Sequence, residues 1–379
     1  MAKKKKQKID RDVKVKTSRD TREGHEGEWY FNAYVPKRKR RYGFKSEKEA
    51  YLAGIEFYIN HTEPTNITFA SAAELYDAAR KLEVADSTRL NDRTYMNGVL
   101  HNYFGDTLVE DIDYAMINSF RVKYSKDGAS NNTINEAMSV LKRVYWFADL
   151  TFNLDLKDAF RHIKPLPYQK SEKAKNNFVS YEQFEKVMAQ FTSPESYLKA
   201  AIMFYSGMRP GEVSALKIDA IDFDNNTLVV RRTVGKNENG KRIIKETTKN
   251  GEKRTVEVSR LIIELIEFYL EDVKRTRPVH NNSFLFHKPT ADNFRGPLNT
   301  AIKRADLDKV ITPHGFRHSY STILLENDIY IKRVADNLGH ANPTVTLRTY
   351  AHAIPKSEDP IVNVMDNLGV KITSGDKND

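Results

Sequence analysis

The chain has 379 residues, enough for two or three domains with cores of their own, which excludes a single small module. It carries 61 Lys and Arg against 51 Asp and Glu, and the whole excess of positive charge lies in residues 1–48, which hold 17 basic and 7 acidic residues. The sequence has no cysteine, so disulfide bonds and thiolate metal sites are excluded, and a reducing, intracellular setting is compatible.

The basic N-terminus favours an arm that binds nucleic acid, because Lys and Arg displace counterions from a polyanion. A solubilising tail is the alternative, above all for Lys3–Lys8. The N-terminus lacks the apolar segment of a secretory signal, and no apolar run approaches a membrane span, since Leu261–Leu270 is interrupted by Glu264 and Glu267. We therefore expect no membrane segment.

Residues 9–60 are predicted to form a small sheet followed by a helix. Alternating side chains indicate strands around Val13–Val15 and Trp29–Val35, and Arg41–Phe44 makes a third. Ser46 and Glu49 then have the spacing of a capping box that starts a helix. Apolar residues follow at helical spacing, namely Tyr51, Ile55, Tyr58 and Ile59. The aromatic residues of this module fit its own core better than a platform for stacking bases.

The next region, residues 67–160, has helical periodicity almost throughout and follows a polar connector at His61–Asn66. Turns are predicted at Gly105–Asp106 and Lys126–Gly128. Periodicity alone predicts a helical bundle without indicating its purpose. Residues 161–177 are rich in Pro, Lys and Ser and are predicted to be a linker.

Beyond the linker, helical periodicity in residues 178–206 gives way to strands. These are expected at Thr227–Thr233, Arg242–Thr247 and Arg254–Val258. Asn250–Gly251 is a hairpin signal between the last two, and Lys249 lies at the mouth of that hairpin.

Four short motifs carry the chemistry of the chain. They are Tyr205–Glu212, which contains Arg209; Thr312–His318; Leu338–His340; and Thr349–His352, which contains Tyr350. Pro313 fits the first position of a helix capped by Thr312, which places His314, Arg317 and His318 on one helix face. Arginine binds phosphate oxygens, histidine exchanges protons near neutrality, and a phenolate can form a covalent phosphodiester. The set indicates a phosphate site with a tyrosine nucleophile.

In order and spacing, Arg209, the His314 and Arg317 pair, Leu338–His340 and Tyr350 resemble the catalytic domain of the tyrosine recombinases, or phage integrases. The resemblance is strong over roughly residues 175–355. Residues 1–60 resemble the arm-binding domain of integrases from Gram-positive phages and conjugative transposons, in which a three-stranded sheet enters the major groove. Basic residues between two of its strands would contact DNA, namely Lys37, Arg38, Lys39, Arg40 and Arg41.

The resemblance implies a multidomain α+β fold. It comprises an arm-type DNA-binding domain (1–60), a helical core-binding domain (67–160), the linker (161–177), a mainly helical catalytic domain with a small antiparallel sheet (178–355), and a C-terminal tail (356–379). The tail has a short apolar stripe, which suits docking on a partner protomer or folding back on its own domain. That stripe comprises Ile361, Val362, Val364, Met365 and Leu368.

The resemblance also implies the residue roles. Tyr350 would attack a DNA phosphodiester to give a 3′-phosphotyrosine and a free 5′-hydroxyl. Arg209 and Arg317 would neutralise the nonbridging oxygens, and Lys249 would protonate the leaving 5′-oxygen. His314 would transfer a proton or donate a hydrogen bond. No cofactor is implied, and no ATP-binding motif is present.

Three further residues complete the expected site. His340 would be an additional phosphate ligand, Glu212 would orient Arg209, and His318 would support the same helix face as His314.

Some positions have competing interpretations. His314 and His318 have the i, i+4 spacing of a zinc pair, but Gly315 stands where the zinc motif needs glutamate, so no metal is expected. Tyr320 and Tyr330 compete with Tyr350, and the ten-residue step from His340 favours Tyr350. Lys245 and Lys253 compete with Lys249, since hairpin register is uncertain by a residue or two.

The function implied is a site-specific integrase that inserts and excises a mobile element or prophage in the cytoplasm of a bacterium, at the nucleoid. Its partners would be double-stranded DNA with core-type and arm-type sites, three further copies in a homotetramer, and accessory DNA-bending or excision-directing proteins. The alternatives are a type IB topoisomerase, which would relax DNA as a monomer, and a DNA-binding regulator that forms no covalent complex.

Overall fold

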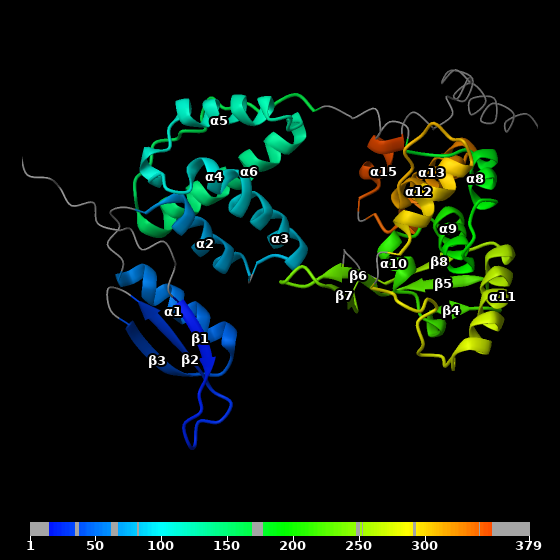
Figure 1. Cartoon of the computed structure of the whole chain (residues 1–379), viewed down its shortest axis with the longest axis horizontal. Coiled ribbons are helices and arrows are strands. Elements are labelled where there is room, and N and C mark those ends of the chain that lie inside the picture. The colour runs from blue at the N-terminus through cyan, green and yellow to red at the C-terminus, as the bar shows by residue number, and fades with distance from the viewer. Residues whose placement is uncertain are drawn as a thin grey trace, which may run out of the picture. The chain divides into compact units, whose positions relative to one another are not determined.

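The computed structural model describes residues 15–34, 38–61, 67–81, 83–168, 177–247, 251, 253–290, 293–340 and 342–350. The chain divides into two compact units, which are coloured in chain order in Figure 1. They are Met1–Lys170 with Lys236–Lys241, and Ser171–Gly235 with Arg242–Asp379. This division does not separate residues 1–60 from the helices that follow, so the finer domain boundaries stay predictions. Within the described part, the helices are too short or too polar to cross a membrane.

A three-stranded antiparallel sheet with one helix begins the first unit. Its strands are β1 (Val15–Arg19), β2 (Trp29–Tyr34) and β3 (Arg38–Phe44), in that order, and α1 (Glu47–His61) packs on one face. Phe31 and Ala33 of β2 are fully buried, and the Phe31 ring lies 5.8 Å from that of Phe57 in α1. Phe31 is therefore a core residue, as its alternation predicts. Val13 and Val35 lie outside the described residues.

The basic run is predicted to lie between two strands, with Arg41 also at the start of the third, and the placement between strands is wrong for Arg38, Lys39 and Arg40. Arg38, Lys39, Arg40 and Arg41 lie within β3 and pair with β2. Every β3 side chain before Phe44 is exposed, so the charged groups stay in water. The backbone hydrogen bonds to β2 are enough to form the strand. Lys37 lies outside the described residues.

Helices make up most of the rest of the first unit. They are α2 (Phe69–Arg80), α3 (Asp86–Tyr95), a π-helical turn (Met96–Leu100), α4 (His101–Phe104), α5 (Tyr114–Lys126) and α6 (Asn131–Phe152). Helix α6 starts at Ser130, whose hydroxyl accepts the Thr133 N–H, and ends at Asn153 in the left-handed conformation. Residues 153–168 form turns and extended chain, so the prediction of helix to residue 160 is too long. The turn at Gly128 is confirmed by its φ of 89°.

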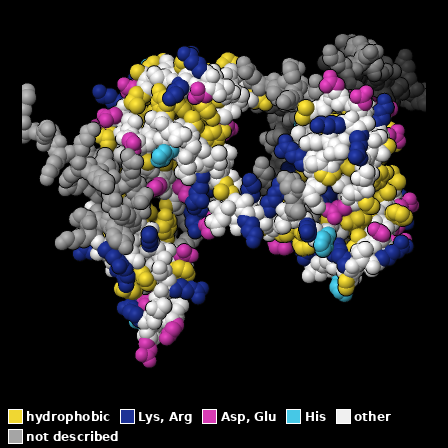
Figure 2. All heavy atoms as spheres, viewed as in Figure 1, with side chains coloured by type: hydrophobic (Ala, Val, Ile, Leu, Met, Phe, Trp, Pro, Cys, Tyr) yellow, Lys and Arg dark blue, Asp and Glu magenta, His cyan; other side chains and the backbone are white. Residues whose placement is uncertain are grey.

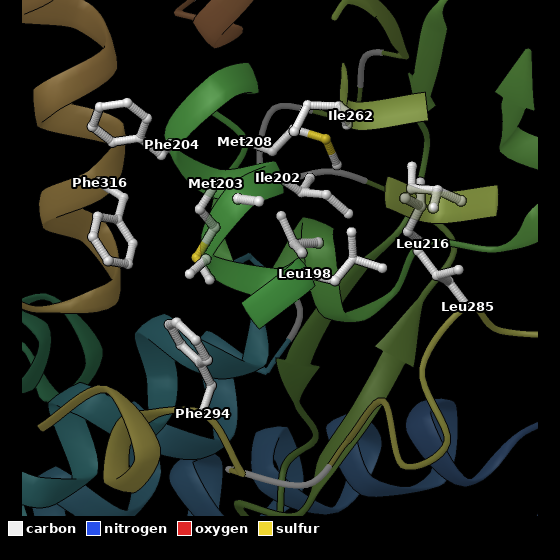
Figure 3. Packing of buried hydrophobic residues seen from close by; sticks show 14 of the residues in the cluster. Leu198, Ile202, Met203, Phe204, Met208, Leu216, Ile262, Leu285, Phe294 and Phe316 are labelled. Atoms are coloured by element: carbon white, nitrogen blue, oxygen red, sulfur yellow. The ribbon is translucent and has the colours of Figure 1, made fainter. Parts of the chain in front are cut away.

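The core of the second unit is built around α9 (Pro194–Ser206), with α8 (Tyr181–Met188) and α10 (Pro210–Ser214) on either side in sequence. Pro194 starts α9 next to Ser193, whose hydroxyl accepts the Ser196 N–H. Figure 3 shows the apolar side chains of α9 directed into this core, with Phe204 close to Phe316. The Phe204 ring stacks on Phe184 with centroids 3.7 Å apart. The helix that precedes Arg209 is thus fixed on several sides.

Two small antiparallel sheets complete this region. One has the order β4 (Ile221–Asp222), β5 (Thr227–Val230), β8 (Arg254–Glu257), and the other pairs β6 (Thr233–Lys236) with β7 (Arg242–Lys245). The predicted hairpin between β7 and β8 at Asn250–Gly251 is therefore wrong for the described strands. The sharp turn instead lies at Asn239–Gly240, the same dipeptide eleven residues earlier, where Gly240 has a φ of 75°.

Within the described residues, five helices follow the sheets. They are α11 (Arg260–Thr276), α12 (Arg295–Arg304), α13 (Pro313–Glu326), α14 (Ile331–Leu338) and α15 (Pro343–Tyr350). Helix α13 packs against α9, and α14 packs against both α15 and β8. The ends of α9, α14 and α15 thereby meet one side of α13. The predicted C-terminal stripe, Ile361 to Leu368, lies outside the described residues.

Candidate phosphate-binding site

The start of α13 carries the central residues. Pro313 is its first residue and Thr312 precedes it in extended conformation, as predicted. Gly315 packs directly on Asn177, so a Cβ at Gly315 would overlap that side chain. The Asn177 Oδ1 accepts the Thr312 N–H at 2.8 Å, and its Nδ2 donates to the Thr312 hydroxyl at 2.9 Å. Asn177, the last residue of the predicted linker, therefore holds the turn that presents His314 and Arg317.

Arg317 is buried, with 2% of its surface exposed, and joins two helix ends. Its Nη1 donates to the carbonyl of Gly207 after α9, and its Nη2 donates to the carbonyl of Leu338 at the end of α14, both at 2.7 Å. Burial and the charge of Arg209 lower the pKa of Arg317 to about 9, which leaves it protonated at pH 7. These acceptors are neutral, so the guanidinium keeps its positive charge for an anion.

Arg209 shares one buried carboxylate with a second arginine. Glu212 accepts from the Arg209 N–H at 2.8 Å and from Arg209 Nη1 at 2.9 Å. Arg254 of β8 donates to both Glu212 oxygens, at 3.0 and 2.6 Å. Burial opposes ionisation of Glu212, but the hydrogen bonds from Arg254 outweigh it and lower the pKa of the carboxyl. Glu212 is therefore an anion at neutral pH.

The same two arginines reach the motif that carries His340. Arg209 Nη2 donates to the carbonyl of Gly339 at 3.3 Å, and Arg254 Nε donates to the carbonyl of Asn337 at 2.9 Å. Glu212 hydrogen-bonds to Arg209 and Arg254, and Arg317 adds a third guanidinium group whose charge also interacts with this carboxylate. The excess of positive charge suits a phosphodiester, which carries one negative charge.

The hydrogen bonds of His340 fix its tautomer. Its Nε2 lies 3.0 Å from Arg317 Nη2, which can only donate, so Nε2 is the acceptor. Its Nδ1 lies 2.7 Å from the hydroxyl of Thr346, a fully buried residue of α15, so Nδ1 carries the proton. Burial and the charges of Arg317 and Arg209 lower the pKa of His340 to about 4. His340 is a neutral imidazole that holds Arg317 and links α14 to α15.

His314 lies at the exposed rim of the site. Its ring is perpendicular to that of His318, with centroids 5.2 Å apart. Loss of hydration, His318 and Arg317 lower the pKa of His314 to about 4. Water reaches this ring and offsets part of that effect, and the lowered pKa favours neutral imidazole at pH 7.

Tyr350 ends the described part of α15 and is 4% exposed. Its hydroxyl lies 2.8 Å from Nδ1 of His318. Burial raises the pKa of Tyr350, while Ser321 and Arg317 oppose that rise, so the phenol is neutral. The competing tyrosines are placed differently, since Tyr330 is 70% exposed and the Tyr320 hydroxyl is hydrogen-bonded to Asn337.

The described residues of the predicted site lie together. Arg209, His314, Arg317, His340 and Tyr350 are brought together, whereas Lys249 lies outside the described residues. Its competitors lie in or beside the strands, Lys245 at the end of β7 and Lys253 just before β8.

Arg254, Asn177 and Thr346 complete the site and were not anticipated. The sequence pattern could have indicated Arg254, because it alternates with the fully buried Val256 and so faces inward on its strand. Asn177 pairs with a residue 135 positions away, and no local pattern predicts that contact.

The N-terminal basic residues divide between the two faces of β3. Arg41 pairs with the buried Phe31 and lies over the ring of Phe57 in α1, at 4.9 Å. Arg38 and Arg40 alternate with it, and both donate through Nε to Asn32 Oδ1, at 2.9 and 2.7 Å. Figure 2 shows basic side chains at the surface of this module. The sheet face opposite α1 is thus the face that offers Arg38 and Arg40.

Another group in this module could in principle contact a cation. Asp20, His25 and Glu28 have ligand atoms within 4.8 Å of one another. The Asp20 carboxylate, however, is already engaged by Arg22, with oxygen to nitrogen distances down to 2.6 Å. That ion pair lowers the pKa of Asp20 to about 2 and satisfies its charge without a metal.

The chain is similar to known proteins over much of its length. Residues 177–356 match the model of the phage integrase family. The chain is similar to the ICEBs1 integrase of Bacillus subtilis (strain 168), with 22% identity over 316 residues, 80% of this chain and 84% of the relative. It is also similar to the transposase of transposon Tn916 from Enterococcus faecalis, with 23% identity over 297 residues, 73% of this chain and 72% of the relative.

Among solved structures, the fold is similar to that of the Tn1549 transposon integrase in complex with transposon right end DNA. The TM-score is 0.63 at 20% sequence identity, over 80% of this chain and all of the other. The expected α+β fold is thereby confirmed.

The network around Glu212 generates a first prediction. Arg254→Met should lower the free energy of unfolding by about 3 kcal/mol, because it leaves a buried carboxylate with one partner fewer. Arg260→Met is the matched control, since Arg260 pairs with Glu264 where both side chains are 57% exposed, and its loss should cost under about 1 kcal/mol. Urea unfolding of the full chain, followed by circular dichroism, measures both. Equal, small losses would contradict the account.

The imidazole of His340 generates a second prediction. Its NMR signals should titrate near pH 4 rather than 6.5, with the His340→Gln variant used to assign them. Since the folded pKa is depressed, the unfolded chain binds more protons between pH 4 and 6.5, so the free energy of unfolding falls as pH falls through that window. A titration midpoint at or above 6.5 would show that Nε2 does not accept from Arg317.

Proposed function

Because residues 177–356 form a domain of the phage integrase family, we propose that the chain is a site-specific tyrosine recombinase that integrates and excises a mobile element or prophage. One observation carries this proposal. Two charged arginines, Arg209 and Arg317, converge with neutral His340 and with Tyr350 at the ends of four helices. A phosphate held by the two guanidinium groups would lie beside a phenol.

The proposed reaction is a pair of transesterifications. The Tyr350 oxygen attacks the DNA phosphorus and the 5′-oxygen leaves, which gives a 3′-phosphotyrosine. Arg209 and Arg317 neutralise charge on the nonbridging oxygens as the phosphorus becomes five-coordinate. A 5′-hydroxyl of a second duplex reverses the step. One phosphoester bond replaces another at each stage, so no nucleotide hydrolysis is needed.

His340 has a different role here from the phosphate ligand implied by the resemblance. Its Nε2 accepts from Arg317 and its proton is on Nδ1, so it has no donor for a phosphate oxygen in this state. We assign it to orient Arg317. His314, at the rim, is available to a phosphate or to a leaving group. Lys249 remains the proposed acid for the 5′-oxygen.

The N-terminal module is proposed to bind a second, arm-type DNA site. Its open sheet face presents Lys16, Arg38 and Arg40 with Tyr30 and Tyr42, and the Arg40 guanidinium lies 4.7 Å above the Tyr30 ring. Arginine held by an aromatic ring and by Asn32 is pre-oriented for phosphates or base edges. Lys39 and Arg41 alternate to the other face and would contribute less.

The assembly follows from the reaction. Exchange between two duplexes needs four cleavages, so we propose a homotetramer on core-type sites, with accessory bending or excision-directing proteins that bring arm and core sites together. The place of action would be the nucleoid in the bacterial cytoplasm.

A trapping experiment tests the proposed activity. Nicked duplexes are drawn from the DNA that flanks the coding sequence and are incubated without metal or ATP with the parent, Tyr350→Phe and Tyr330→Phe. We expect a covalent protein–DNA adduct with the parent and with Tyr330→Phe, whose ring is exposed, and none with Tyr350→Phe.

The products then separate the alternatives. Recombinant joints between two duplexes support the proposal. Relaxed circles without recombinants would indicate a type IB topoisomerase, and specific binding without any adduct would indicate a DNA-binding regulator.

A further inference from the structure

His318 has no part in the reaction outlined above, yet it contacts the reacting oxygen. It lies on α13 one residue after Arg317, and its Nδ1 is 2.8 Å from the Tyr350 hydroxyl. The centroids of these two rings are 5.6 Å apart, and the His318 ring also contacts that of His314. The order of contacts is therefore His314, His318, Tyr350.

Tyr350 needs a proton acceptor close at hand. A neutral phenol is a weak nucleophile, and the side chain is 4% exposed, which keeps bulk water from its hydroxyl. Burial raises the pKa of Tyr350, so spontaneous ionisation at neutral pH is unfavourable.

The other groups near the phenol are poorly suited to take its proton. Both nitrogens of His340 are engaged, by Arg317 and by Thr346. The Ser321 hydroxyl donates to the Arg317 carbonyl at 2.9 Å, and a hydroxyl is a poor base. His314 is separated from Tyr350 by the His318 ring in the order of contacts. Within the part of the chain that the structure describes, the imidazole of His318 is the basic group within hydrogen-bond distance of the Tyr350 hydroxyl.

We propose that His318 is the general base that accepts the phenolic proton of Tyr350 during DNA cleavage, an inference that rests on the proposed recombinase activity. The proton moves from the Tyr350 oxygen to His318 Nδ1 as the bond from that oxygen to phosphorus forms. The bond from phosphorus to the 5′-oxygen breaks, and that oxygen takes a proton from the general acid, the role proposed for Lys249. In rejoining, the imidazolium returns the proton to the departing phenolate.

The two histidines of α13 are placed differently. His318 touches the attacking oxygen from within the helix cluster, whereas His314 lies at the exposed rim. The positive charge of the imidazolium formed at His318 would be balanced by the extra negative charge that the phosphoryl group gains in the transition state.

The test compares a variant that keeps the hydrogen bond with one that removes it. His318→Asn offers an amide oxygen near the position of Nδ1 but cannot take a proton, and His318→Ala offers neither. Single-turnover cleavage of a nicked duplex should fall by about 10²- to 10⁴-fold in both, as for loss of a general base, with DNA affinity unchanged. His280→Ala, which removes an exposed histidine of the same unit, should cleave at the parent rate. Cleavage by His318→Asn at the parent rate would reduce His318 to a positioning residue and overturn the proposal.

A second readout separates base catalysis from damage to the fold. Incorporation of 3,5-difluorotyrosine at position 350 makes the phenol more acidic and lowers its need for a base. We expect 3,5-difluorotyrosine to raise the cleavage rate of His318→Ala at least tenfold more than it raises the cleavage rate of the parent. An equal effect in both backgrounds would overturn the proposal. Failure of the parent itself to form an adduct would instead refute the recombinase assignment.

Discussion

The site depends on holding Arg209 and Arg317 close together without cancelling their positive charge. Glu212 is buried and accepts from both Arg209 and Arg254, so one carboxylate orients two guanidinium groups and leaves positive charge in excess. Arg317 is held by main-chain carbonyls and by His340, none of which is negative. Burial of like charges is unfavourable on its own, and the hydrogen bonds from helix ends compensate for it. A bound phosphate would complete the balance.

This arrangement explains what the surrounding fold has to achieve. The carbonyl of Gly207 is available to Arg317 because α9 ends there in the left-handed conformation, with a φ of 65°. A Cβ at this position would also overlap the ring of Tyr320. Both the left-handed conformation and the close contact with Tyr320 therefore favour glycine at position 207. The stacked and perpendicular rings of Phe184, Phe204 and Phe316 fix α9 against α13. The apolar core therefore sets the distance between Arg317 and its acceptors. It thereby fixes the position of the guanidinium group that would bind the phosphate.

Local signals in the sequence predicted much of this site, and the failures share a cause. Thr312 and Pro313 mark a helix start, and helical spacing then placed His314 and Arg317 on one face. The strand pairing was wrong because Asn250–Gly251 and Asn239–Gly240 carry the same turn chemistry, and only long-range pairing of β8 with β5 distinguishes them. Arg254 and Asn177 were missed for the same reason, since their partners are 42 and 135 residues away. The Tyr350 contact with His318 depends on how α15 folds back onto α13, which no periodicity encodes.

The most direct test of charge neutralisation at this site uses a duplex in which a methylphosphonate replaces the scissile phosphate and so removes its negative charge. Parent and Arg209→Ala chains are compared for covalent adduct formation on this duplex and on the natural one. If Arg209 neutralises charge, Arg209→Ala should cleave the phosphate at least about 100-fold more slowly than the parent, as for loss of a transition-state donor, and should recover most of that loss on the methylphosphonate. Equal loss on both duplexes, with DNA binding intact, would contradict it.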